Sequence, residues 1–117
     1  MKTNIRKCAT TFTFEDDHLV RYRAGPDGRS YTHRCSLKVF ETVAHAFDET
    51  PNDGIGIAAP DIAKSEDLPF TQVDVAVGFL ADRGIIDRRH RRNYPASPSV
   101  HLDAMIEWHA LKEVKGD

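Results

Sequence analysis

The sequence of 117 residues lacks several features that would assign a protein to a class at once. Its two cysteines, Cys8 and Cys35, cannot form the disulfide framework of a small secreted domain, and they favour a reducing compartment. No apolar run approaches the ~20 residues that a transmembrane helix needs. The first 14 residues contain no continuous apolar stretch of the kind found in secretory signals. We therefore expect a cytoplasmic protein with no membrane partner.

An excess of charge of one sign is also missing, since 16 Lys+Arg stand against 18 Asp+Glu and the formal net charge is −2. The charges are nevertheless segregated along the chain. Basic and acidic side chains number eight and four over 1–40, one and nine over 41–82, five and one over 83–94, and two and four over 95–117. Segregated charge creates local fields that the net charge averages out. The total therefore does not exclude a nucleic-acid partner, although one part of the fold could equally neutralise another.

The composition that is present, 40% apolar and 29% charged, is typical of a folded globular domain, and the length suits one domain with a short extension. The first 35 residues have the two-residue period of β-strands. Phe12 and Phe14 fall on one face of a strand over 9–14. Residues 18–23 and 29–34 flank Gly25-Pro26-Asp27-Gly28, a turn signal that predicts a β-hairpin.

From Ser36 onwards the apolar residues repeat with helical spacing. Ser36 is a good N-cap for a first helix, and Pro60 is placed to begin a second, short helix. Gly84 would end a third helix, and Ser97-Pro98 would begin a last one. The pattern predicts helices over about 37–47, 60–67, 70–83 and 98–114, and strands over 85–89 and 92–94.

Four segments of this region carry a family resemblance. They are Ala59-Pro60-Asp61-Ile62-Ala63-Lys64, Leu68-Pro69-Phe70-Thr71-Gln72-Val73, Leu80-Ala81-Asp82-Arg83-Gly84-Ile85-Ile86-Asp87-Arg88 and Arg91-Arg92-Asn93-Tyr94-Pro95-Ala96-Ser97. In order and type they resemble the winged helix-turn-helix domains of small bacterial transcription regulators. The resemblance implies a winged-helix domain over 36–114. The β-hairpin extension over 1–35 is not part of that family pattern, and residues 115–117 form a tail, so the expected fold is α+β, mainly α.

The wing is the most basic part of the domain. In this family the second helix of the motif enters the major groove and the wing contacts phosphates or the minor groove. Phosphate contacts need cations. The residues that we expect to contact nucleic acid here are Arg88, Arg89, Arg91, Arg92 and Tyr94. The alternative is a solvated, charged edge hairpin that resists aggregation.

The helix that would read bases has an unusual composition for that role. With Val73, Val77 and Leu80 facing inward, its outward side holds two acids, Asp74 and Asp82. Only Thr71 and Gln72 remain as candidate base readers. The outward Val75 and Phe79, with Gly78 between them, are typical of a covered surface. The predicted hairpin would cover it, or a partner protein would.

The remaining candidates do not form a catalytic or cofactor site. Cys8, His33 and Cys35 lack zinc-ligand spacing, so no metal or other cofactor is expected. Cys35 precedes a helix, where the helix dipole can lower a thiol pKa, so a reactive thiol stays open. Trp108 lies on an apolar stripe of the last helix with Val100 and Leu111, and this stripe would be core or the seam of a homodimer.

The sequence therefore predicts a non-enzymatic, nucleic-acid-associated protein of the transcription-regulator type, which binds double-stranded DNA through its wing. Arg21, Arg23 and Arg29 of the hairpin are candidate helpers. The main alternative is a protein-interaction module that uses the outward Val75/Phe79 surface and binds no DNA. A further alternative is a small-molecule or redox sensor at Cys35 and the seam between hairpin and domain.

Overall fold

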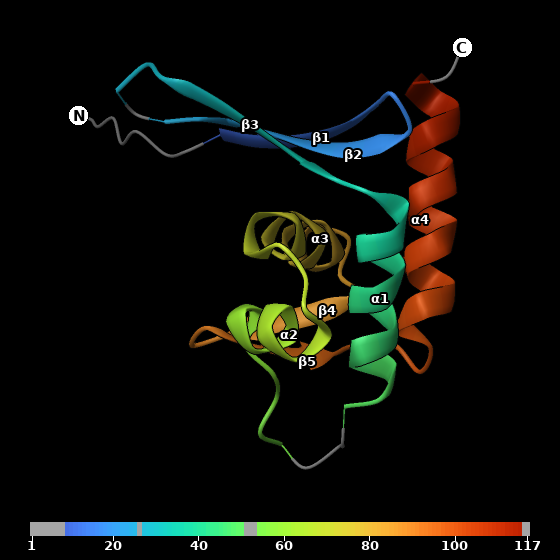
Figure 1. Cartoon of the computed structure of the whole chain (residues 1–117). Coiled ribbons are helices and arrows are strands. Elements are labelled where there is room, and N and C mark those ends of the chain that lie inside the picture. Colours follow the sequence, from blue (N-terminus) through green and yellow to red (C-terminus); the bar gives the residue numbers. More distant parts are fainter. Residues whose placement is uncertain (1–8, 26, 51–53, 116–117) are drawn as a thin grey trace, which may run out of the picture.

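A computed structural model describes residues 9–25, 27–50 and 54–115 of the chain (Figure 1). Over these residues the fold is α+β, with four helices and two small antiparallel sheets. The elements in chain order are β1 (Ala9–Glu15), β2 (His18–Ala24), β3 (Ser30–Cys35), α1 (Leu37–Asp48), α2 (Ala59–Glu66), α3 (Phe70–Asp82), β4 (Ile86–Arg89), β5 (Arg92–Pro95) and α4 (Val100–Lys115). No helix in these ranges is long and apolar enough to cross a membrane.

The N-terminal strands form a sheet of order β1-β2-β3, so β1 adds a third strand to the predicted hairpin. A two-residue turn joins β1 to β2, and its residues Asp16 and Asp17 both have positive φ, 51° and 61°. Two positive φ values are typical of the tight turn whose twist matches that of antiparallel strands. The short turn fixes the register, in which Phe12 pairs with Arg21 and Phe14 with Leu19.

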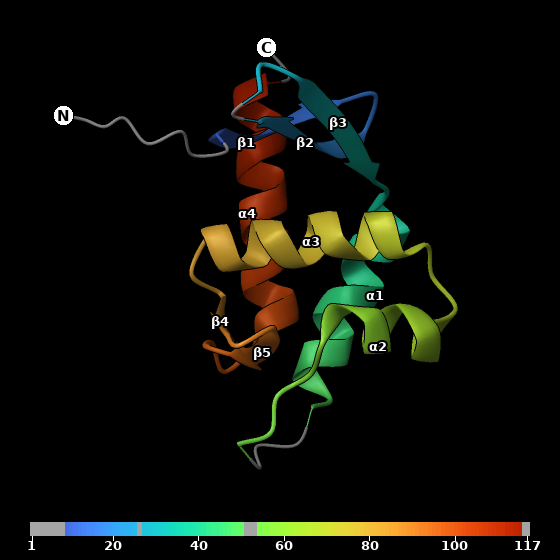
Figure 2. The same cartoon turned by 90° about the vertical axis from the view of Figure 1, so that its left-hand side faces the viewer.

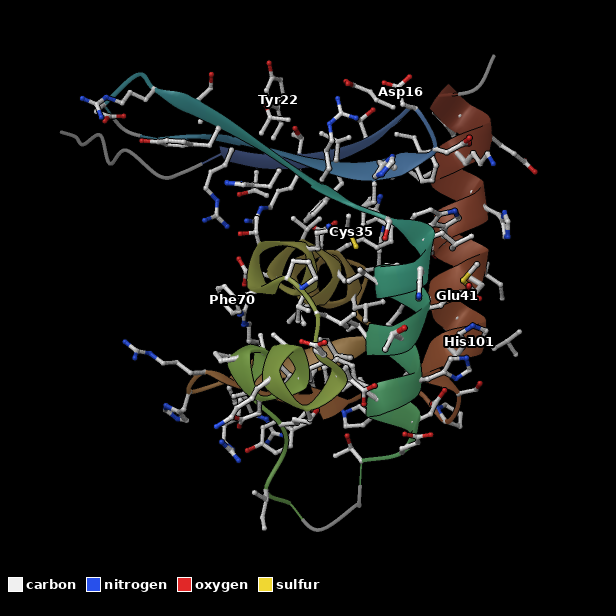
Figure 3. The ribbon with its side chains drawn as sticks, in the orientation of Figure 1. Asp16, Tyr22, Cys35, Glu41, Phe70 and His101 are labelled. Atoms are coloured by element: carbon white, nitrogen blue, oxygen red, sulfur yellow. The ribbon has the colours of Figure 1, made fainter. Side chains whose placement is uncertain are left out.

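One face of this sheet lies on α3. Phe14, Leu19 and Cys35 are buried and share one apolar core with the helices. Phe12 makes an edge-to-face contact with Phe79 of α3, with ring centroids 5.4 Å apart. Phe14 contacts Trp108 of α4 in the same way at 4.7 Å. The predicted extension therefore contributes to the main core, and the opposite face of the sheet carries exposed residues such as Tyr22 (Figure 3).

The starts of α1 and α4 are set by side chains that accept hydrogen bonds from backbone N–H groups. Ser36 caps α1 as predicted, since its hydroxyl accepts a bond from the Val39 N–H. The start of α4 at Val100 lies two residues beyond the predicted start at Pro98. The Asp48 carboxylate, at the end of α1, accepts bonds from the N–H groups of Val100 and His101 at 2.7 and 2.9 Å. A carboxylate distant in sequence therefore sets this boundary.

Helix α3 lies in the middle of the molecule, between other elements on several sides. Figure 2 shows it crossing the view, with the three-stranded sheet above it and α2 and the β4–β5 hairpin below it. Helices α1 and α4 lie beside one another behind it. This position leaves one narrow side of α3 open, and that side runs between the sheet and the β4–β5 hairpin.

Candidate nucleic-acid interface

The β4–β5 hairpin has the tight turn that the sequence predicted around His90-Arg91. Both residues have positive φ, 51° and 68°, in a turn where Asn-Gly would be the usual choice. The pairing places Arg88 opposite Asn93 and Arg89 opposite Arg92. Because side chains alternate along a strand, Arg88 and Arg89 point to opposite faces of the hairpin.

The arginines on the two faces of the β4–β5 hairpin differ in their surroundings. Arg88 faces α3, where its Nη2 lies 3.9 Å from a carboxylate oxygen of Asp74. On the other face the Arg89 guanidinium lies 4.0 Å from the centre of the Tyr94 ring, a cation–π contact. Arg91 occupies the exposed turn and has no ion pair within the described ranges. The predicted residues thus form two separate cationic faces and a basic tip.

The hairpin is fastened to the segment that precedes α2. Asn93 is buried, and its backbone exchanges two hydrogen bonds with Ile57 at 3.0 and 2.9 Å. The Asn93 side-chain amide also donates to the Ile57 carbonyl at 3.0 Å. Arg92 donates from Nε to the carbonyl of Ile55 at 2.8 Å. Arg92 is the first residue after the turn, so this bond holds the turn end of β5 to the segment before α2.

The two candidate base readers at the start of α3 differ in availability. Thr71 is exposed. Gln72 is half-buried, and its side-chain oxygen accepts a hydrogen bond from the Ser36 N–H at 3.0 Å, just before α1. Gln72 therefore helps to join the starts of α1 and α3, and its amide oxygen is engaged within the fold.

The prediction that Val75 and Phe79 face outward is wrong. Both side chains are fully buried, with no exposed surface. The sheet covers this side of α3, and Phe79 lies between the rings of Phe12 and Phe40. Of the two ways in which the sequence left this surface to be covered, the chain's own N-terminal sheet is the one found. A partner protein has no access to Val75 and Phe79 in this fold.

Trp108 is likewise a core residue, and its stripe does not face a partner. Its side chain is 2% exposed and contacts the rings of Phe14 and Phe40. Val100 is fully buried, and Leu111 packs against the core. The seam predicted for a homodimer along these residues therefore lies inside the molecule. The large apolar side chains that α4 exposes are Leu102, Ile106 and Val114.

Arg21, expected as a helper of the wing, is instead buried beneath the sheet, with only 5% of its surface exposed. Its Nη1 donates to the Asp74 carboxylate at 2.9 Å, and its Nε has no hydrogen-bond partner. No local sequence pattern indicates this pairing, because the two residues lie 53 positions apart. Arg23 and Arg29 are exposed, and Arg29 lies 3.4 Å from Asp27.

Cys35 is buried at the end of β3, next to α3 (Figure 3). Burial raises the pKa of its thiol from 9.0 to about 12, which outweighs any lowering by the α1 dipole. A neutral thiol is a poor nucleophile, so burial makes the Cys35 thiol less reactive. Among the described residues no three His, Cys, Asp or Glu side chains gather as metal ligands do. Cys8 lies outside the described residues.

Comparisons with known proteins leave the chain without an assigned relative. No protein-family model matches it, and comparisons with curated proteins and with solved structures also find no match. The functional argument therefore depends on the geometry described above.

Proposed function

We propose that the chain is a non-enzymatic winged-helix protein of the transcription-regulator type, which binds the phosphate backbone of duplex DNA through its β4–β5 hairpin. Its proposed setting is the cytoplasm. The order of α1, α2, α3, the β4–β5 hairpin and α4 supports the winged-helix part of the proposal. The bridge between Ile57 and Asn93 adds the short third strand with which such a hairpin is usually associated.

The observation that carries the proposal is the state of the hairpin arginines. Arg89, Arg91 and Arg92 have no acidic partner within the described ranges, whereas Arg88 has one only at 3.9 Å. Their positive charge is therefore not neutralised inside the fold. Exposed guanidinium groups on a projecting turn are suited to phosphate contacts, which position a protein on DNA without reading its sequence.

The covered state of α3 supports backbone contact in preference to base reading. The residues of α3 that keep some exposure along its open side include Asp74, Gly78 and Asp82, and none of them has a side-chain donor for a phosphate of the duplex. The sheet occupies the space over Val75 and Phe79. We therefore propose DNA binding of low sequence selectivity, in which α3 does not enter the major groove.

The test is fluorescence anisotropy with a labelled duplex of about 20 base pairs at about 50 mM salt, where a protein with several phosphate contacts binds most strongly. The wild-type chain should bind, and a variant with Arg88, Arg89, Arg91 and Arg92 all changed to Gln should bind at least ~10-fold more weakly, as the loss of several charge-assisted contacts requires. Thermal unfolding of both proteins checks that the variant is folded. Absence of binding by the wild-type chain would overturn the proposal.

A further inference from the structure

A groove of about 570 Å³ runs between the underside of the sheet, α3 and the start of the β4–β5 hairpin. Its walls come from three elements that are distant in the sequence. Thr10, Phe12, Arg21 and Arg23 line it from the sheet, and Arg88 lines it from β4. Helix α3 provides its floor. A cavity of this volume is in the range of small-molecule sites, although it is more polar than most.

Arg21 lines this groove, and the burial of its guanidinium group is energetically unfavourable. The side chain is 6% exposed, and its Nε is buried with no hydrogen-bond partner. An unpaired, buried donor on a charged group destabilises the folded state. Since Arg21 lines the groove, an acceptor bound there would lie next to this side chain, although the Nε atom itself is closed to solvent.

The charges around the groove do not cancel. Asp74 lies between two arginines, 2.9 Å from Arg21 and 3.9 Å from Arg88. Asp82, the other acid of the groove, is paired with Arg83 at 2.6 Å. Arg83 also pairs with Glu107 at 3.3 Å, so it does not neutralise Asp82 alone. Arg23 has no ion pair in the described part of the chain. Three guanidinium groups therefore face two carboxylates in the groove, which leaves one positive charge in excess.

The excess of positive charge indicates which class of ligand the groove would bind. A phosphate monoester carries about −1.5 to −2 charges near pH 7, opposite in sign to the arginines. It also has three acceptor oxygens, one for each of the three arginine side chains. Phe12 is half-buried in the wall and, with Gly78 and Ala81 on the floor, gives an apolar surface for the organic part of such a molecule. A carboxylate has only two acceptor oxygens, and the two oxygens of Asp74 already lie next to Arg21 and Arg88.

We propose that this groove is a binding site for a phosphate monoester, held by Arg21, Arg23 and Arg88. The site shares only Arg88 with the proposed duplex contact, since Arg89, Arg91 and Arg92 do not line it. Arg88 belongs to the same hairpin, so an occupied groove engages the first strand of that hairpin together with the sheet.

The test is isothermal titration calorimetry of the full chain with inorganic phosphate and with adenosine monophosphate, using adenosine as the control that lacks the phosphate. Both phosphate ligands should bind, and adenosine should not. Arg23→Gln and Arg88→Gln should each weaken binding by ~10-fold or more, the effect expected for loss of a charge-assisted hydrogen bond. Both residues are exposed, so both variants should keep the wild-type unfolding temperature.

Arg34→Gln is the matched control. The Arg34 side chain is 46% exposed, as is that of Arg88, and it also lies within 4 Å of an acid, but on the face of the sheet that points away from the groove. Its affinity for both phosphate ligands should stay within twofold of wild type. An equal loss in Arg34→Gln and Arg88→Gln, or the absence of binding at 10-millimolar-scale ligand, would overturn a monoester site.

A duplex titration identifies the source of the phosphate. In one outcome free phosphate and the monoester fail to bind, while Arg23→Gln weakens duplex binding. The groove then binds a phosphate of the DNA backbone, and the proposal of a monoester site is wrong. If the monoester binds and the duplex does not, the groove stands and the proposed function fails. The two proposals are therefore separable in the same set of proteins.

Discussion

The three-stranded sheet and the β4–β5 hairpin share the same local design. Each has an antiparallel strand pair closed by two residues with positive φ, Asp16-Asp17 in one and His90-Arg91 in the other, and each contains several arginines. They differ in what those charges contact. The acidic turn is joined to α4 by Asp17 and Lys112 at 3.3 Å, whereas the basic turn has no such partner in the described ranges.

The difference extends to the arginines. In the sheet, Arg21 is buried against Asp74, and Arg34 lies 3.5 Å from Glu15. In the hairpin, Arg89 contacts only an aromatic ring among its described neighbours, and Arg91 projects at the tip. The N-terminal sheet is therefore held to α3 by an ion pair, whereas the arginines of the β4–β5 hairpin keep their charge on the surface. The following predictions test this division, in order of decreasing effect.

The largest effect is expected where the sheet covers α3. Phe79→Asp would place a carboxylate in a fully buried position between two aromatic rings, at a cost of several kcal/mol that a domain of this size cannot absorb. We expect loss of the cooperative unfolding transition in circular dichroism. Phe79→Leu, the apolar control, should unfold cooperatively with a loss of about 1–2 kcal/mol. A stable Phe79→Asp protein would show that the sheet does not cover α3.

The ion pair beneath the sheet should give the next largest effect. Asp74→Asn leaves the Arg21 charge buried without a counter-charge, and we expect a loss of about 2–4 kcal/mol in urea unfolding, below the full penalty because the Asp74 side chain is 26% exposed. In a double-mutant cycle with Arg21→Met, the two changes should be coupled by more than ~1 kcal/mol. Additive losses would mean that the pair does not hold the sheet to α3.

The buried thiol at the end of β3 predicts a pH dependence that the hairpin should not share. The folded chain keeps the Cys35 proton up to about pH 12, whereas an unfolded chain releases it near 9.0. The contribution to stability is therefore complete below about pH 9, and it falls as pH rises from 9 towards 12, by ~1.4 kcal/mol per unit. Urea unfolding at pH 8 and pH 10 measures this fall.

Cys35→Ala in a Cys8→Ser background is the control, because it removes the titrating group from the folded core. Its stability should change less between pH 8 and pH 10 than that of Cys8→Ser alone. An equal change in the two proteins would show that the thiol does not titrate in the way its burial requires.

The two turns should respond differently to glycine. Arg91→Gly relieves a positive φ at no loss of an internal contact, so the free energy of unfolding should rise by about 0.5–1 kcal/mol. Asp17→Gly gives the same backbone relief but loses the exposed pair with Lys112, so its gain should be smaller. Thermal unfolding compares the two directly. A larger gain for Asp17→Gly would contradict the different roles of the turns.

Much of the local structure could be predicted because its signals are local. Ser36 caps α1 as expected, and the His90-Arg91 turn lies where two short strands flank it. The error over Val75 and Phe79 arose from assigning α3 a single inward face. Buried residues cover a broad arc of the helix that includes Val75 and Phe79, a pattern typical of a helix covered on more than one side.

The candidate sites depend on contacts that no local pattern encodes. The pairing of Arg21 with Asp74 joins a strand to a helix 53 residues away, and Arg88 approaches the same carboxylate from β4. Asp48 caps a helix that begins 52 residues later. The order of the residues shows that charge is segregated along the chain, but only the fold shows which arginines are neutralised and which are not.

The most direct test of that division is the salt dependence of duplex binding by two matched double variants. Arg89→Gln with Arg91→Gln removes two charges from the hairpin, and Arg29→Gln with Arg34→Gln removes two from the sheet. The logarithm of the association constant should fall with the logarithm of salt concentration by ~0.9 per phosphate contact. We expect the hairpin variant to flatten this slope by about 1–2 and the sheet variant to leave it unchanged. Equal slopes in the two variants would contradict the account.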